Sequence, residues 1–380
     1  MPFFYNGSDL RDSYITQSDI NSMLTALAAS GLFSWGRNDQ GQLGLGDVVP
    51  RSSPVQVGSL LGWDKPACGP LHTVVPKTDG SLWACGYNIP GNLGLGDRTN
   101  RNSPVQVGSL LTWNKVAGAA RHSVATKTDG SLWTCGYNGY GNLGLGDRTN
   151  RSSPVQVGSL LTWNNIACGK DHTAATKTDG SLWAWGYNYY GGLGLGDLTD
   201  RSSPVQVGTL LTWNNVACGY YHTVATKTDG SLWAWGYTGD GELGLGDDFP
   251  NRSSPVQVGS LLTWNNVACG FYHTVATKTD GSLWVWGRND LGQLGLGNVT
   301  NRSSPVQVGS LLTWKNAAGG NYHTVATKTD GSLWSWGLNT YGQLGLGDIA
   351  NRSSPVQVGT LLTWKNIAAG SNHTVATKTN

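Results

Sequence analysis

The sequence predicts an all-β protein, a seven-bladed β-propeller built from four-stranded blades. Three observations lead to this fold class. A unit of about 50 residues recurs seven times, each unit contains four short strand-like segments, and Glu242 is the only glutamate among 380 residues. Helical proteins rely on glutamate, lysine and alanine, whereas repeats of four strands are typical of propeller blades.

Each unit contains the segments PVQVG, NNVACG, HTVATKT and SLWAWG, with small variations. These segments are rich in Val, Thr and Trp and are bounded by Gly, Pro or Asn, a pattern that favours β-strands. Asp-Gly joins HTVATKT to SLWAWG, and it is the strongest short hairpin signal because glycine supplies the positive φ of a type I′ turn. The SLWAWG-type strands begin at Leu32, Leu82, Leu132, Leu182, Leu232, Leu283 and Leu333.

The ends of the repeat array favour a closed ring over an open solenoid. The last copy stops at HTVATKTN, one strand short, and the first copy begins with an extra strand, GLFSWG. Residues 32–36 are therefore expected to complete the last blade, made by residues 355–379, and to close the ring. A closed ring has no terminal repeats to cap and leaves only short, protected edges, whereas an open stack must cap both of its ends. Residues 32–380 form the propeller domain in this interpretation.

The motifs WGxNxxGQLGLGD, SPVQV and VACGxxHTVAxxxDG resemble the regulator of chromosome condensation repeat. The resemblance covers residues 32–380, and seven copies in register make it specific for the fold. It implies a seven-bladed propeller. It says less about function, because the family includes exchange factors, photoreceptors, protein inhibitors, and bacterial and viral chains.

Residues 1–31 precede the repeats and differ from them in composition. Ser18 can cap a short helix that Gly31 would terminate. This segment is expected either to pack on the propeller or to attach the protein to another structure, and it resembles the short leaders of phage structural proteins. The expected attachment residues combine an aromatic anchor with an apolar helical stripe, and they are Phe3, Phe4, Tyr5, Ile20, Met23, Leu24 and Leu27.

Residues that recur in every copy are expected to serve the scaffold. All seven histidines occupy one repeat position, from His72 to His373, and they lie too far apart to share a metal ion. We expect them to be structural and hydrogen-bonded to backbone. The L-G-L-G-D loop lacks a following helix, so its glycines indicate tight turns rather than a phosphate site. The six cysteines are expected to be packing thiols, and no cofactor or metal is expected.

The copies differ mainly in the pair before His, in the x-x of Y-N-x-x-G and in the stretch after L-G-L-G-D. Strand direction places all three stretches on one face of the ring. Tyrosine at loop tips gives a large contact area with little rotamer entropy, so this face is expected to bind a partner. The alternative is drifted loops with tyrosines lying flat on neighbouring blades. The predicted partner-binding residues are Tyr140, Tyr189, Tyr190, Tyr220, Tyr221, Phe271, Tyr272, Tyr322, Tyr341, Arg121, Lys170 and Asp171.

Composition argues against several classes of partner. The net charge is +2 and the basic residues are spread evenly around the ring, so no nucleic-acid surface is expected. No apolar stretch approaches the ~20 residues of a membrane helix, so no membrane insertion is expected. No basic n-region precedes an apolar core, as it would in a secretory signal. Synthesis in a cytoplasm is therefore expected, with a virion as a further location.

The sequence thus predicts a non-enzymatic interaction protein that binds a protein or a glycan through the tyrosine-rich face. In this interpretation it is a virion-associated (phage) component, anchored by its N-terminal segment, with virion or self-assembly contacts through residues 1–30. One alternative is a purely structural decoration or spacer protein. Another is a regulator that resembles a guanine-nucleotide exchange factor. The titratable residues of the variable face form no recognisable acid–base or nucleophile–base set.

Overall fold

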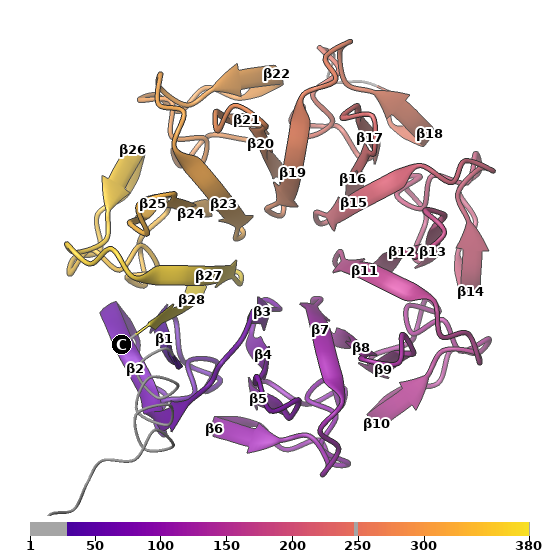
Figure 1. The fold of residues 1–380 in the computed structure, drawn as a ribbon, viewed down its shortest axis with the longest axis horizontal. Coiled ribbons are helices and arrows are strands. Elements are labelled where there is room, and N and C mark those ends of the chain that lie inside the picture. The colour runs from indigo at the N-terminus through magenta and orange to yellow at the C-terminus, as the bar shows by residue number, and fades with distance from the viewer. Residues whose placement is uncertain (1–28, 247–249, 380) are drawn as a thin grey trace, which may run out of the picture.

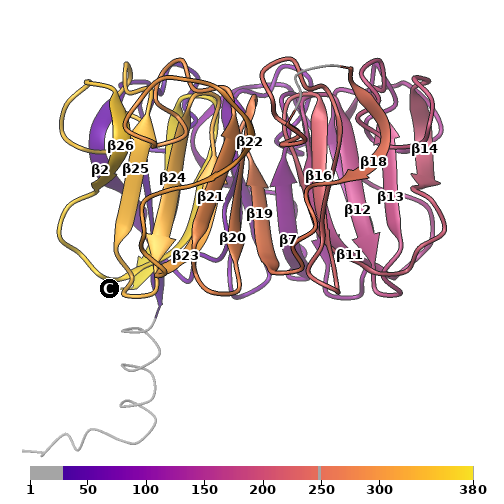
Figure 2. The same ribbon diagram turned by 90° about the horizontal axis from the view of Figure 1, so that it is seen from above.

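The computed structural model describes residues 29–246 and 250–379, and these residues form seven antiparallel four-stranded sheets arranged around a central axis (Figure 1). Figure 2 shows the ring from the side, with the strands running between two flat faces. The predicted fold class is therefore confirmed. The expected helix and the attachment residues between Phe3 and Leu27 lie outside the described residues.

Each blade has an inner strand beside the axis, two middle strands and an outer strand (Figure 1). The inner strands are β3 (Ala67–Cys68), β7 (Trp113–Gly118), β11 (Trp163–Cys168), β15 (Trp213–Cys218), β19 (Trp264–Cys269), β23 (Trp314–Gly319) and β27 (Trp364–Ala369). The second strands are β4 (His72–Pro76), β8 (His122–Lys127), β12 (His172–Lys177), β16 (His222–Lys227), β20 (His273–Lys278), β24 (His323–Lys328) and β28 (His373–Thr379).

The two remaining strands of each blade come from the W-G and S-P-V-Q segments of the repeat. The third strands are β1 (Ser30–Gly36), β5 (Leu82–Gly86), β9 (Leu132–Gly136), β13 (Leu182–Gly186), β17 (Leu232–Gly236), β21 (Leu283–Gly287) and β25 (Leu333–Gly337). The outer strands are β2 (Arg51–Leu61), β6 (Arg101–Gln106), β10 (Arg151–Gln156), β14 (Arg201–Gln206), β18 (Arg252–Gln257), β22 (Arg302–Gln307) and β26 (Arg352–Gln357).

Strands from both ends of the repeat array close the ring, as predicted. β1 pairs with β28 over its whole length, from Ser30 opposite Thr379 to Gly36 opposite His373. The closing blade has the strand order β2-β1-β28-β27, so each end of the array contributes two strands. The assignment of residues 355–357 to the closing blade was wrong. Each third strand continues directly into the outer strand of its own blade, so 352–357 is the outer strand of the preceding blade and β2 is that of the closing blade.

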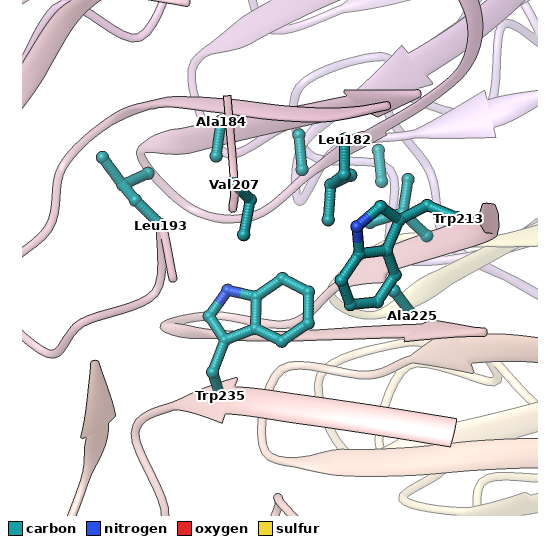
Figure 3. Packing of buried hydrophobic residues seen from close by; sticks show 10 residues of the cluster. Leu182, Ala184, Leu193, Val207, Trp213, Ala225 and Trp235 are labelled. Atoms are coloured by element: carbon teal, nitrogen blue, oxygen red, sulfur yellow. The ribbon is translucent and has the colours of Figure 1, made fainter. Parts of the chain in front are cut away.

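Tryptophan fills the space between neighbouring blades. At one such interface, Trp235 is fully buried and its ring meets that of Trp213 edge to face at 5.8 Å (Figure 3). Its Nε1 donates a hydrogen bond to the carbonyl oxygen of Gly192 in the preceding blade, at 2.9 Å. Gly194 adopts φ +71°, and a Cβ there would lie 2.7 Å from Trp235 Nε1, so this position of the L-G-L-G-D loop requires glycine. The loop is thus a packed turn, as expected from the sequence.

All six cysteines are unpaired thiols, as expected for packing residues. Cys85 and Cys135 occupy the repeat position that Trp235 fills, and burial raises the pKa of each to about 12. The other four lie on inner strands and line a central channel of about 520 Å³.

The two flat faces of the ring have different loops. The variable face carries the loops between inner and second strands and those between third and outer strands. The turn face carries the T-D-G hairpins and the G-S-L-L-T linkers between blades, and the first residue of β1 lies at this face. Within the described part of the chain, no helix is long and apolar enough to cross a membrane.

Candidate functional site

A ring of hydrogen bonds between neighbouring blades lies beneath the variable face. Each of the seven histidines is buried and places Nε2 near the hydroxyl of a Thr or Ser in the next blade. The distances run from 2.8 Å for His273 and Thr324 to 3.2 Å for His373 and Thr73, the pair that closes the ring. The histidines are thus structural, but their partner is a side-chain hydroxyl of the next blade and not the expected backbone group.

The same hydroxyls fix the histidine tautomer. Thr223 Oγ1 donates to the carbonyl oxygen of Gly192 at 2.8 Å, so it accepts its bond from Nε2–H of His172. Nδ1 then carries the lone pair, and in His273 it has no hydrogen-bond partner. Burial lowers the pKa of all seven imidazoles to between about 3 and about 4. The histidines are therefore neutral at physiological pH.

An aromatic cluster lies on the variable face above these bonds. Its centre is a set of four tyrosines in which Tyr190 contacts Tyr221 at 4.7 Å and Tyr237 at 5.2 Å, and Tyr187 contacts Tyr221 at 5.7 Å between ring centroids. Edge and tilted contacts at these distances hold each ring in place more firmly than burial alone. Burial also raises the pKa of Tyr187 to about 12, so its hydroxyl stays protonated and can donate.

The cluster extends to both sides along the ring of blades. On one side Tyr140 meets Tyr187 at 4.9 Å. On the other side Tyr220 contacts Phe271 at 4.9 Å and Tyr272 at 5.3 Å, and Tyr272 stacks on Tyr322. The continuous set, here called the tyrosine cluster, consists of Tyr137, Tyr140, Tyr187, Tyr189, Tyr190, Tyr220, Tyr221, Tyr237, Phe271, Tyr272 and Tyr322.

Three cations lie against these rings. Lys170 Nζ is 4.6 Å from the centroid of Tyr220 and 3.0 Å from the hydroxyl oxygen of Tyr221. Burial disfavours its charge, but the two tyrosine hydroxyls outweigh that effect, and the pKa of Lys170 lies above its usual value. The guanidinium of Arg121 lies 4.4 Å from the centroid of Tyr137, and Arg288 lies 5.1 Å from that of Tyr322.

Most of the predicted partner-binding residues come together in this cluster. Asp171 lies beside it, where burial raises the pKa of its carboxyl while Arg121, 3.7 Å away, and Lys170 oppose the rise. Tyr189 is 64% exposed, whereas most of the other rings are half-buried. Tyr341 is separate from the cluster and lies against Arg37. The predicted aromatic residues other than Tyr341 thus pack against one another across neighbouring blades, and do not only lie flat on the blade beside them.

The sequence-based prediction missed Tyr137, Tyr187, Tyr237 and Arg288. They occupy the first position of the Y-N-x-x-G motif, which is not one of the three variable stretches identified from the sequence. The available signal was that this position also varies, since the other copies have Arg37, Arg288 or Leu338.

Glu242 is a buried carboxyl next to the cluster. It occupies the repeat position of Gln42, Gln293 and Gln343. Its Oε2 accepts a hydrogen bond from the backbone N–H of Asp240 at 2.9 Å, while Oε1 is buried without a partner. Burial raises the pKa of Glu242 to about 8; the backbone hydrogen bonds oppose this rise, and the negative charge of Asp240 adds to it. The carboxyl is therefore largely protonated at neutral pH.

Glu242→Gln is expected to stabilise the protein at neutral and alkaline pH. Because the folded pKa, about 8, exceeds the unfolded value of 4.5, the wild type loses stability as pH rises from about 4.5 to about 8. Glutamine has no ionisable group, so the gain of the variant over wild type should rise from about 2 kcal/mol at pH 6 to about 4 kcal/mol at pH 8. Urea unfolding at both pH values measures this difference. A gain that does not depend on pH would contradict the assignment.

Over residues 29–246 and 250–379, no group of three or more His, Cys, Asp or Glu side chains is placed to hold a metal ion.

The fold and the loop-built cluster define a class of protein: a seven-bladed β-propeller with a candidate recognition site on one face. Comparison with known families then identifies the group within this class. The chain belongs to the regulator of chromosome condensation (RCC1) repeat family, whose pattern matches seven consecutive segments. These segments are residues 30–75, 79–126, 129–176, 179–226, 229–277, 280–327 and 330–377.

Solved structures with the same fold include human WBSCR16, with 22% sequence identity, a TM-score of 0.84 and coverage of 93% of this chain and 99% of that chain. Prp20p from Saccharomyces cerevisiae, described with its binding properties to Gsp1p and histones, has 21% identity and a TM-score of 0.80, over 93% and 92% of the two chains. Yeast RCC1 (Prp20) bound to Kap60 has 20% identity and a TM-score of 0.83, over 100% and 96%. These similarities show the fold.

Among sequence relatives, a protein RCC2 homolog from Xenopus laevis is 46% identical over 55 residues. This match spans 14% of the present chain and 11% of the length of that protein.

Proposed function

We propose that this protein is a non-enzymatic binding module that holds a protein partner on its tyrosine cluster. One observation carries the proposal: eleven aromatic rings from adjacent blades form one continuous cluster on the face where the copies differ in sequence. Aromatic side chains held by their neighbours lose little conformational entropy when a partner covers them. Tyrosine and arginine are also enriched among the residues that dominate binding energy at interfaces.

Lys170 gives the cluster a chemical preference. Its ammonium group contacts the ring of Tyr220 and the hydroxyl of Tyr221, and the carboxyl of the adjacent Asp171 is buried and lies near Arg121. A carboxylate of the partner can therefore reach a cation that already lies on an aromatic surface. Such charge-assisted bonds are about twice as strong as neutral ones.

The relatives support a protein partner over a glycan. Prp20p has binding properties toward Gsp1p and histones, and yeast RCC1 (Prp20) binds Kap60. All of these partners are proteins. A glycan therefore becomes the alternative outcome of the test, and the predicted lack of nucleic-acid partners stays a prediction.

The other interpretations of the sequence also remain proposals. A spacer protein would use the variable face only for contacts with other copies. An exchange factor would need a site for a nucleotide-binding protein, and the similarity to Prp20p concerns the fold alone. A virion-associated role would depend on residues 1–30, which lie outside the described residues apart from Ala29 and Ser30.

A capture experiment tests the proposal with three forms of the full chain. Wild type, a cluster variant (Tyr190→Ala, Tyr221→Ala and Tyr272→Ala) and a control variant (Tyr87→Ala) are immobilised and exposed to a lysate of the cells in which the protein occurs. Tyr87 is a half-buried tyrosine at the same repeat position as Tyr187, outside the cluster. The wild type and the control are expected to retain one protein, and the cluster variant is expected to bind it at least 30-fold more weakly, since hot-spot truncations cost about 2 kcal/mol or more.

The outcomes separate the alternatives. Equal capture by all three forms would show that the cluster is not the binding surface. Elution by free oligosaccharide would identify a glycan ligand. Near-ultraviolet circular dichroism of each form checks that the propeller is intact.

A further inference from the structure

The turn face carries an exposed ring of leucines that the tyrosine cluster does not involve. Every copy has the linker S-L-L or T-L-L, from Leu60–Leu61 to Leu361–Leu362, and thirteen of these fourteen leucines are exposed, with exposed fractions between 46% and 58%. We call this set the leucine ring. Among the exposed large hydrophobic residues of the described chain, only Leu198 is a leucine outside it.

The linker geometry explains why these side chains point outward. In one linker, Val107 and Trp113 are both buried, and their backbone N–H groups donate to the carbonyl oxygens of Leu82 and Gly80. The N–H of Thr128 donates to the carbonyl oxygen of Thr112 at 2.8 Å. The linker is thus fixed at both ends, and Leu110 and Leu111 between them have no core to enter. The apolar surface is permanent, not the product of a loose loop.

A comparison within the chain shows that these leucines are not neutral. The residue after L-G-L-G-D on the variable face is equally exposed, but it changes from Val48 to Arg98 to Leu198 among the copies. The copies share one history, so both positions had the same time to diverge. Leu-Leu is nevertheless kept in all seven linkers. An exposed apolar pair that recurs in every blade gives the turn face a repeated apolar surface, the kind of surface that partners cover.

The size of the ring fits a stable interface. At about 80 Å² of exposed apolar surface each, thirteen half-exposed leucines present on the order of 1,000 Å². A standard protein interface buries about 800 Å² on each partner. The leucine ring therefore has enough surface for a dimer.

We propose that the leucine ring is a dimer interface, on which a second copy of this chain packs its own turn face. Only a flat or sevenfold-repeated surface can meet all seven leucine pairs in the same way, and a second copy has that repeat. A lipid bilayer is also flat, but exposed aspartates of the T-D-G hairpins, such as Asp79 and Asp129, share the turn face and disfavour an anionic membrane. Lys65 is exposed on the same face and can form an ion pair with an aspartate of a T-D-G hairpin in the other copy.

Sedimentation velocity on the full chain at micromolar concentrations tests this proposal. Wild type is expected to sediment as a dimer. Leu211→Asp with Leu262→Asp places four carboxylates in the interface of a twofold dimer, and its dissociation constant is expected to rise at least about 100-fold, giving monomers. A control variant, Leu198→Asp with Val299→Asp, changes two equally exposed residues on the variable face and is expected to remain a dimer.

Three results would overturn the proposal. The first is a dimer that survives the substitutions at Leu211 and Leu262, and the second is a control variant that also dissociates. The third is a monomeric wild type. In that case flotation with neutral lipid vesicles would show that a bilayer covers the ring. Hydrogen-exchange protection of residues 109–112 that disappears in Leu24→Asp with Leu27→Asp would show that residues 1–28 cover it.

Discussion

Acid is expected to unfold this protein steeply, beginning near pH 6. The seven buried histidines have pKa values between about 3 and about 4 in the folded state and 6.5 when unfolded. The unfolded chain therefore binds more protons. Stability that is fully present above pH 6.5 is lost as pH falls toward the folded pKa values, at about 1.4 kcal/mol per pH unit for each histidine. All seven together give about 10 kcal/mol per pH unit.

The geometry of the histidine ring explains why protonation is so unfavourable. Nε2 already donates to a hydroxyl, so an added proton must reside on Nδ1, which in His72 and His273 faces no acceptor. The resulting imidazolium is a buried charge without a partner, and it destabilises the interface between two neighbouring blades. The aspartates of the T-D-G hairpins, such as Asp79, have pKa values below 3.8 and reinforce the effect only at lower pH. Glu242 acts in the opposite direction, but it is a single group.

Urea unfolding followed by tryptophan fluorescence between pH 7.5 and 4.5 measures this dependence. His222→Gln should reduce the slope by about one seventh, at the price of some stability at pH 7. A free energy of unfolding that stays constant between pH 6.5 and 5 would contradict the burial of the histidines as neutral groups.

Exchanging cysteine and tryptophan at one repeat position is expected to change stability in opposite directions. Trp235→Cys removes a fully buried indole and its hydrogen bond to the carbonyl oxygen of Gly192. A large-to-small change of this kind costs about 3–5 kcal/mol. Cys135 occupies the same position in its own blade and lies beside a cavity of about 20 Å³. This cavity is smaller than an indole ring, so neighbouring side chains must shift as well, and Cys135→Trp is expected to gain only about 1 kcal/mol.

The reverse substitution has an acceptor available. Cys135 Sγ lies 3.6 Å from the carbonyl oxygen of Asn92, the atom that corresponds to the acceptor of Trp235. An indole at position 135 can therefore make the hydrogen bond that Trp35, Trp185, Trp235, Trp286 and Trp336 make in other copies. Thermal unfolding of both variants gives the comparison. A loss of stability in Cys135→Trp would show that the blade has closed around the cysteine and that the larger ring overpacks it.

The sequence allowed the fold to be predicted because one pattern recurs seven times. The period, the Asp-Gly hairpins and the extra strand at residues 32–36 determine the number of blades and the closure of the ring. The variable face could be located because strand direction follows from the order of the segments. The structural role of the histidines was predicted correctly, but their hydrogen-bond partner, a hydroxyl of the next blade, was not predictable. For six histidines the acceptor lies 51 or 52 residues further along the chain, and for His373 it lies 300 residues earlier, so no local pattern marks the partner.

The tyrosine cluster could be predicted only in part, for a related reason. Residues such as Tyr221 and Tyr272 stand where the copies differ, so comparison of the copies identifies them. Tyr187 and Tyr237 stand where most copies agree, and their contribution depends on the neighbours that each blade provides. Tyr87 has the same repeat position but no aromatic neighbours at its site, because the pair in the next blade is Ala120 and Arg121. A contact between two aromatic side chains depends on the residues at two variable positions in neighbouring blades. The sequence of one repeat does not show both of them.

The closing blade also sets the order of events during synthesis. β1 and β28 are more than 330 residues apart in the chain, yet they are direct partners in one sheet. At about 5–20 residues per second, the ribosome needs on the order of 20–70 s after completing β1 to deliver its partner. During this interval β1 has one unpaired edge, which is a template for wrong pairing with other chains. Protection by a chaperone during synthesis is therefore expected to matter most for the first hairpin, β1–β2. In the finished ring that hairpin is as well paired as any other.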